Sequence, residues 1–227
     1  AYRYTEYTYD SRGRTTGYAQ IDQSRQPTQE DIRAHQITYT YNADGNLEAV
    51  SYPTKKNGIA GLRYVYNANG QLTEIKGQTE SEPKTIRTYT YDAYGKIKQI
   101  KDIRNLSSDG SQAVQKDYTY DEFDRVIKIS AKDLGTGKEM ESYTYTYDKN
   151  SHITKKTQIN RYPEKKEVNE TKAYTYDTLG RLTKTVTRDH TNEDQKKTVT
   201  YTYDPAGNRL SEDDGTEKTT YTYNGLD

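Results

Sequence analysis

The stretch that decides the predicted fold is Tyr174-Thr175-Tyr176-Asp177-Thr178-Leu179-Gly180-Arg181-Leu182. Alternate side chains of a β-strand share a face, so the two tyrosines point to one side and the threonine between them to the other. An Asp followed three residues later by Gly is typical of a type I turn that ends in a left-handed residue and closes a hairpin. The stretch therefore predicts a strand, a tight turn and the start of a returning strand.

The Tyr-x-Tyr-Asx triad that opens this stretch occurs nine times, and eight steps of about 27 residues each carry it from Asp10 to Asn224. A fixed period of this length is the signature of a repeat architecture. The triads contain 18 of the 25 tyrosines, so the tyrosine count follows the repeat count. The candidate structural signature comprises Tyr7, Tyr9, Asp10, Gly13, Tyr39, Tyr41, Asn42, Gly45, Tyr64, Tyr66, Asn67, Gly70, Tyr89, Tyr91, Asp92, Gly95, Tyr118, Tyr120, Asp121, Tyr145, Tyr147, Asp148, Tyr174, Tyr176, Asp177, Gly180, Tyr201, Tyr203, Asp204, Gly207, Tyr221, Tyr223 and Asn224.

The third residue after the Asx, position +3, is Gly in six of the eight complete repeats. Gly adopts the left-handed conformation without steric penalty. Asp124 takes this position in one repeat, and Asp tolerates that conformation better than most residues. Ser151 takes it in another, and the turn model offers no equally good reason for a serine there.

The apolar residue at position +5 sets the expected register of each hairpin. If +3 is a bulge, the Asx pairs with +4 and the second tyrosine pairs with +5, as Tyr176 with Leu182. This register also brings opposite charges together at Asp10–Arg14, Asp92–Lys96, Asp121–Arg125 and Asp177–Arg181. A second apolar residue often follows at +8, as Val50 and Ile75 do. Its odd spacing from +5 indicates either another bulge in the returning strand or burial of that strand on both faces.

The segments between hairpins are polar and vary in length, so we expect surface loops there, for example over Gln23–Asp31, Pro53–Gly61 and Arg104–Gln112. Thr28 and Asp31 have the spacing of a helix cap, but we favour a loop at this place as well. The even steps show no domain boundary. We therefore expect residues 1–227 to form a single array of about eight complete repeats and a truncated ninth.

Composition excludes several classes of protein. Lys and Arg together number 34, as do Asp and Glu, and a net charge of zero argues against nucleic-acid binding. No apolar run is long enough to cross a membrane as a helix. The absence of cysteine excludes disulfides, thiolate metal sites and cysteine nucleophiles. Leu, Ile, Val and Phe make up only about 13% of the chain, so the tyrosines must supply much of the apolar surface that folding buries.

No set of residues predicts catalysis, and we expect a chain that is not an enzyme and has no metal or cofactor. His35, His152 and His190 lack the spacing of metal ligands, and a structural surface role is favoured for each. Neither a calcium loop nor a phosphate-binding loop is present. The one pattern with binding potential is the row of tyrosines, because phenol rings stack on sugars. A structural role is favoured, since the repeat geometry fixes the positions of the tyrosines.

The pattern of residues 174–182 resembles the YD repeat of the Rhs family, and residues 204–210 are similar to another common form of it. The resemblance covers essentially the whole chain. It extends to bacterial Rhs polymorphic toxins, wall-associated proteins of Gram-positive bacteria, insecticidal toxin complexes and animal teneurins. In that family it implies a strip of β-hairpins wound into a hollow shell, which encloses a C-terminal toxic domain in the toxins and serves cell-surface adhesion in the teneurins.

The chain departs from the family pattern in two respects. It has fewer repeats than a full shell, and the self-cleaving segment with paired Asp-Pro motifs is not found; Asp204-Pro205 lies alone in an ordinary repeat turn. We therefore expect an all-β fold of antiparallel hairpin repeats that form one continuous curved or spiral sheet, as an open fragment of a larger shell.

The expected function is that of a non-enzymatic shell segment of a secreted or cell-surface bacterial protein that encapsulates or presents a toxin or other domain. The alternative is a carbohydrate-binding or adhesion module. The expected partners are the remaining repeats and domains of the same parent protein. Edge-to-edge self-association and carbohydrate are further candidates, whereas nucleic acid and membrane insertion are not expected.

Overall fold

The computed structural model describes residues 2–103, 113–162, 166–191 and 195–224. The segment Arg104–Gln112, for which we expected a loop, lies outside the described residues. The contacts between Cα atoms divide the chain into two compact units, Ala1–Val114 and Gln115–Asp227. Each unit is described by itself, and the single array over residues 1–227 stays a prediction.

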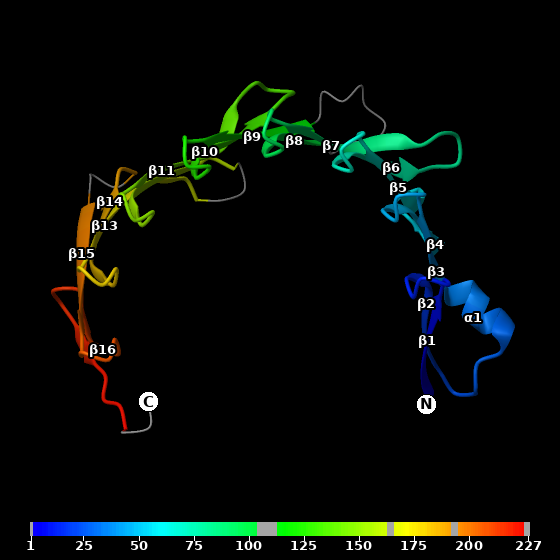
Figure 1. Cartoon of the computed structure of the whole chain (residues 1–227), viewed down its shortest axis with the longest axis horizontal. Helices are drawn as coiled ribbons and strands as arrows, with labels where there is room; N and C mark the ends of the chain where they lie inside the picture. Colours follow the sequence, from blue (N-terminus) through cyan, green and yellow to red (C-terminus); the bar gives the residue numbers. More distant parts are fainter. Residues whose placement is uncertain (1, 104–112, 163–165, 192–194, 225–227) are drawn as a thin grey trace. The chain divides into compact units, whose positions relative to one another are not determined.

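The first unit is a series of β-hairpins with one inserted helix (Figure 1). Each strand from β1 to β7 pairs antiparallel with the next strand in the chain. The elements are β1 (Tyr2–Tyr9), β2 (Thr15–Gln23), α1 (Gln29–His35), β3 (Ile37–Tyr41), β4 (Leu47–Lys56), β5 (Ile59–Tyr66), β6 (Leu72–Gln78), β7 (Lys84–Tyr91) and β8 (Ile97–Ile103).

The second unit repeats the same antiparallel order without a helix in its described part. Strand β9 (Ala113–Tyr120), most of which belongs to this unit, pairs with β10. The strands that follow are β10 (Val126–Asp133), β11 (Glu139–Tyr147), β12 (Ile153–Asn160), β13 (Val168–Tyr176), β14 (Leu182–Asp189), β15 (Gln195–Tyr203), β16 (Arg209–Asp213) and β17 (Lys218–Thr220). The predicted all-β fold of antiparallel hairpins is confirmed in both units.

The register within the hairpins is the predicted one. Tyr41 lies opposite Leu47, and the corresponding pairs occur in six further repeats. Directly after this pair the register shifts by one residue, because Thr40 pairs with Ala49 and leaves out the residue between Leu47 and Ala49. This bulge places Val50 opposite Tyr39. The apolar residues at +5 and +8 thus both face the tyrosines, and the bulge is the correct one of the two alternatives.

The two faces of the hairpins differ in exposure. In β3 half-buried Ile37, Tyr39 and Tyr41 alternate with exposed threonines. Among the described residues no large side chain is fully buried. The hydrophobic residues that are buried are Ala19, Ile21, Ile32, Val50, Ala113, Ala131 and Met140. The tyrosines therefore provide a half-buried apolar face rather than the interior of a two-layer core.

Helix α1 corrects our expectation of a loop over Gln23–Asp31. Thr28 accepts a hydrogen bond from the backbone N–H of Asp31 at 3.2 Å, and the Asp31 carboxylate accepts one from the N–H of Thr28 at 2.7 Å. A helix of seven residues is marginal by itself. It forms here because Ile32, only 3% exposed, packs on Ala19 and Ile21 of β2.

The expected loop over Pro53–Gly61 is also largely wrong, because most of this segment belongs to β4 and β5. The two strands join through Asn57 and Gly58, whose φ angles are 53° and 78°. Two consecutive residues with positive φ are typical of the tight turn that matches the twist of a hairpin.

No helix in the described part of the chain is long and apolar enough to cross a membrane.

Candidate functional site: the contacts between successive hairpins

The Asx side chain holds each turn together, as Asp177 shows. Its Oδ1 atom accepts hydrogen bonds from the backbone N–H groups of Leu179 at 3.0 Å and Arg181 at 2.9 Å. The N–H of Gly180 donates to the carbonyl oxygen of Asp177 at 3.0 Å, and Gly180 has a φ of 77°. The turn is thus closed from within by one carboxylate and one left-handed residue.

The two repeats without Gly at +3 form the same turn. Asp124 and Ser151 have φ angles of 65° and 68°, as the glycines do. The hydroxyl of Ser151 also accepts a hydrogen bond from Nη1 of Arg125 at 3.1 Å. Arg125 belongs to the turn of the preceding repeat, so Ser151 links two turns. The turn model did not explain a serine at this position, and this link gives it a structural role.

An arginine at +4 connects its turn to the next hairpin, as Arg181 shows. Nε of Arg181 donates to the Asp177 carboxylate at 2.7 Å, and Nη1 donates to the carbonyl oxygen of Asp204 at 2.8 Å. The guanidinium lies 4.9 Å from the centre of the Tyr203 ring. This is the distance of a cation–π contact. One arginine thus binds its own turn, the following turn and the following tyrosine.

Arg125 repeats this arrangement, and Arg14 shares its contacts with its own turn and with the following tyrosine. Arg125 lies 4.6 Å from the ring centre of Tyr147 and donates to the Asp121 carboxylate, and Arg14 lies 4.3 Å from the ring centre of Tyr41. The four charge pairs expected from the register are all present.

His152 takes the place of the arginine in its repeat. Its Nδ1 atom lies 3.0 Å from Oδ2 of Asp148, and its ring stacks on Tyr176 with the ring centres 4.8 Å apart. The side chain is only 31% exposed. His152 is therefore a packing residue between two repeats rather than a solvated surface residue.

The hydroxyl of the second tyrosine fastens each hairpin to the one before it. Among the described residues this bond is seen in at least seven triads, where the hydroxyl donates to the backbone carbonyl of the +5 residue of the preceding repeat. The bonds run from Tyr41 to Thr15 (2.8 Å), Tyr66 to Leu47 (2.7 Å), Tyr91 to Leu72 (2.7 Å), Tyr147 to Val126 (2.6 Å), Tyr176 to Ile153 (2.8 Å), Tyr203 to Leu182 (2.8 Å) and Tyr223 to Arg209 (2.9 Å).

We call these bonds the tyrosine staples. Sequence reasoning missed them, although one signal was present: the single Phe of the chain, Phe123, lies outside the triads. Phenylalanine would supply the ring but not the hydroxyl.

Electrostatics keep the carboxylates charged and the phenols neutral. The backbone N–H and then the guanidinium of Arg181 lower the pKa of Asp177, and Arg14 does the same to the pKa of Asp10. Burial raises the pKa of Tyr64 and of Tyr174. At neutral pH these two turns therefore have an anion that accepts hydrogen bonds, and these two phenols stay protonated.

The first triad differs from the others in exposure. Tyr7 and Tyr9 are 51% and 60% exposed, and their rings stack on each other with centres 6.4 Å apart. In most later triads both tyrosines are half-buried. The burial of a tyrosine pair thus depends on contact with a neighbouring hairpin.

The described residues contain no group of three or more His, Asp or Glu side chains placed to hold a metal ion. His35 is bound to the carbonyl of Asp31 at the end of α1, and His190 lies 3.1 Å from the hydroxyl of Thr171.

No protein-family model and no curated protein matches the chain. Solved structures do. TcdB2–TccC3 without its hypervariable C-terminal region matches with a TM-score of 0.68 and 18% identity, over 96% of this chain and 12% of that chain. TcdB2–TccC3–Cdc42 matches with a TM-score of 0.66 and 18% identity, over 94% and 11%. The Photorhabdus luminescens Tc holotoxin pore matches with a TM-score of 0.63 and 19% identity, over 92% and 11%.

The chain spans about a tenth of the length of these solved chains. At 18% to 19% identity the likeness establishes the fold. The matched Tc toxin structures have a shell of Rhs/YD repeats. The resemblance drawn from the Tyr-x-Tyr-Asx triads is therefore confirmed at the level of the fold, and the chain has the fold of a segment of an Rhs/YD-repeat shell.

Proposed function

We propose that the chain is a non-enzymatic segment of the β-shell of a large secreted or cell-surface bacterial protein, and that this shell encloses or presents a toxin or another domain. The observation that carries the proposal is the tyrosine staple, which fastens successive hairpins in both units. Its support from other proteins is the shared fold of the Tc toxin structures.

The contacts between hairpins suit a wall that is built one repeat at a time. Each repeat closes its own turn and binds its neighbour through a staple and, in several repeats, a cation over a ring. Such an array draws its stability from nearest-neighbour contacts. Because the tyrosine face is only half-buried, the sheet needs no second layer over most of its length. A wall one sheet thick encloses more space per residue than a two-layer domain does.

The partners in this proposal are the remaining repeats of the same parent protein and the domain that they enclose. The proposed location is extracellular or at the cell surface, by likeness to the Tc toxins. The structural role of the signature residues belongs to the same proposal.

The test uses the full product of the gene that encodes this chain. Thermolysin is added to the intact product at increasing urea concentrations, and protected fragments are identified by mass spectrometry. We expect a domain outside the repeat array to resist cleavage in the intact product. Replacing Tyr147, Tyr176 and Tyr203 with Phe should expose that domain at a lower urea concentration, whereas Tyr94→Phe should not.

Tyr94 is the matched control because its side chain lies at a turn and is 86% exposed. If every other domain of the product is digested as fast in the intact protein as when it is expressed alone, enclosure by this shell is refuted.

A further inference from the structure

Among the described strands of the first unit, the neighbours β2 and β3 share the fewest residue pairs. They pair only at Gly17 with Thr38 and at Tyr18 with Ile37. The next two junctions between hairpins, β4 with β5 and β6 with β7, have four residue pairs each. Cross-strand pairs are the unit of sheet stabilisation. The junction of β2 with β3, which we call the seam, is therefore the weakest pairing between these hairpins.

At the end near the turns, the seam keeps only part of the contacts seen in other repeats. The Tyr41 hydroxyl donates to the carbonyl of Thr15 at 2.8 Å, and Arg14 lies 4.3 Å from the centre of the Tyr41 ring. Nη1 of Arg181 donates to the following turn, whereas Nη1 of Arg14 is buried without a hydrogen-bond partner in the described part of the chain. A buried donor that lacks a partner costs free energy. One staple thus holds this end of the seam, with one bond fewer than at Arg181.

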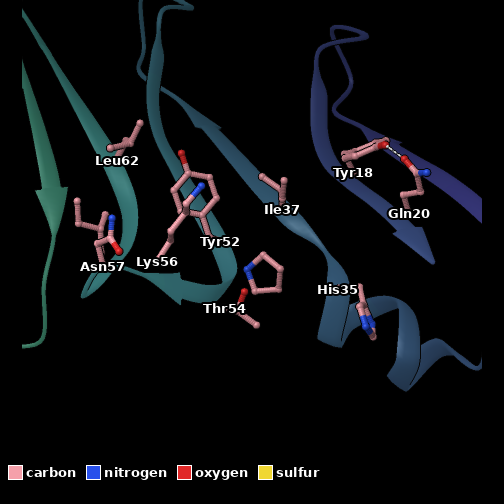
Figure 2. A pocket seen from close by; sticks show the side chains of 11 residues that line it. Tyr18, Gln20, His35, Ile37, Tyr52, Thr54, Lys56, Asn57 and Leu62 are labelled. Atoms are coloured by element: carbon pink, nitrogen blue, oxygen red, sulfur yellow. Dashed lines mark hydrogen bonds between the residues drawn. The ribbon is translucent and has the colours of Figure 1, made fainter. Parts of the chain in front are cut away.

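At the other end β2 and β3 separate, because the chain forms α1 between these two strands. Residues 19–23 of β2 have no partner in β3. A cavity of about 550 Å³ lies there, with Tyr18 of β2 on one side and Ile37 of β3 on the other (Figure 2). Strand pairing and side-chain packing therefore leave this end of the seam open on the side of the cavity.

Helix α1 spans the open end. It lies beside β2 and also contacts β4, the strand beyond β3. Ile32, only 3% exposed, packs on Ala19 and Ile21 of β2, and Tyr4 of β1 packs against the same cluster. Burial of such an apolar side chain is the main source of stability that a short helix can offer. The helix thus joins the β1–β2 hairpin to the β3–β4 hairpin without any strand pairing.

The end of the helix also covers the paired part of the seam. Gln36 is the C-cap of α1. Gly17 of β2 is buried, and a Cβ atom at this position would collide with Nε2 of Gln36 and lie 2.5 Å from the hydroxyl oxygen of Thr8. The absence of a side chain at Gly17 therefore lets the capping residue lie directly over the seam.

We propose that α1 is a strap that holds the seam closed, and that its release lets the β1–β2 hairpin detach while the strands from β4 to β8 stay folded. A two-stranded hairpin is marginal by itself, so its amides exchange once it is detached. Detachment uncovers the edge of β3, and such an edge is a template for another strand. The strap and the seam lie within the first unit, and they do not depend on the proposed shell function.

The experiment measures amide hydrogen exchange of the whole chain. Ile32→Ala removes most of the side chain that joins α1 to β2. We expect the amides of β1 and β2 to exchange about thirtyfold faster, because truncation of a buried isoleucine weakens the structure that depends on it by at least about that factor. The amides of β5 and β6 should change by less than about threefold. Glu30→Ala, an exposed position of the same helix, is the matched control and should change neither set.

A second measurement locks the seam. Tyr18 and Ile37 lie directly opposite each other, and the chain has no cysteine of its own. Replacing both with Cys allows a single disulfide across the seam. With this disulfide closed, adding Ile32→Ala should speed the exchange of β1 and β2 by less than about threefold, because the cross-link restricts detachment. After reduction the large effect of Ile32→Ala should return.

The proposal is overturned if Ile32→Ala and Glu30→Ala give the same exchange in β1 and β2, since α1 then holds nothing closed. It is also overturned if Ile32→Ala speeds β5 and β6 by the same factor as β1 and β2, because the helix then stabilises the whole unit rather than the seam. An effect of Ile32→Ala that is as large with the disulfide closed as with it reduced contradicts detachment at the seam.

Discussion

The tyrosine staples make a quantitative prediction about stability. Replacing Tyr147, Tyr176 and Tyr203 with Phe removes three hydrogen bonds of 2.6 to 2.8 Å to backbone carbonyls and keeps the three rings. A hydrogen bond contributes about 0.5–1.5 kcal/mol net to stability. The three bonds lie in separate contacts between hairpins, so their effects should add. The triple variant should therefore be destabilised by about 1.5–4.5 kcal/mol.

The assay is urea unfolding followed by circular dichroism. The unfolding midpoint should fall while the slope with urea stays the same, because the surface buried by folding hardly changes. Tyr94→Phe is the control and should stay within about 0.5 kcal/mol of the original chain, since its side chain is exposed. A triple variant as stable as this control would refute the staple as a source of stability.

Three further predictions concern the turns and the helix. Backbone N–H groups and Arg181 lower the pKa of Asp177, so its stabilisation is present above the unfolded pKa of about 3.9 and is lost as pH falls below it. Asp177→Asn removes the charge but keeps a side-chain oxygen that accepts hydrogen bonds from the backbone, as in the repeats that carry Asn. Urea unfolding of this variant at a series of pH values should show a weaker loss of stability below about pH 4. A pH profile equal to that of the original chain would contradict the role of the charge. Gly13→Ala should lower the free energy of unfolding by about 1–2 kcal/mol, because alanine is strained in the left-handed conformation. Gly180→Ala should lower it further, because the added Cβ would lie 2.9 Å from Nε2 of His152. Equal losses of thermal stability in the two variants would show that the His152 side chain moves away at no cost. Thr28→Ala should cost about 1 kcal/mol by removing the cap of α1, and hydrogen exchange should speed up at Ile32 but not in β6; uniform exchange would contradict a local effect.

The hairpin order and register could be predicted because they depend on residues that are close in sequence. The Asx and Gly of each turn fix the position of the bulge, and the alternation of Tyr41 and Thr40 fixes which face is apolar. The +5 and +8 positions already pointed to a second bulge as one of two explanations.

The contacts between repeats could not be predicted in this way. Whether the Tyr176 hydroxyl reaches the carbonyl of Ile153 depends on how far one hairpin is displaced along its neighbour, and no local pattern encodes that displacement. The role of His152 was missed for the same reason. Helix α1 had its signal in Thr28 and Asp31, but the burial of Ile32 that stabilises so short a helix becomes visible only once β2 is in place.

The central claim is that each hairpin is stabilised by its nearest neighbours, and deletion of one repeat tests it most directly. Removing residues 148–176 joins Tyr147 to Asp177 and keeps the triad intact. We expect this variant to fold, with the amide protection of β14 and β15 retained in hydrogen exchange. Removing residues 148–175 instead shifts the strand by one residue and moves its tyrosines to the opposite face, so protection should be lost. Loss of protection throughout the second unit after the in-phase deletion would contradict the claim.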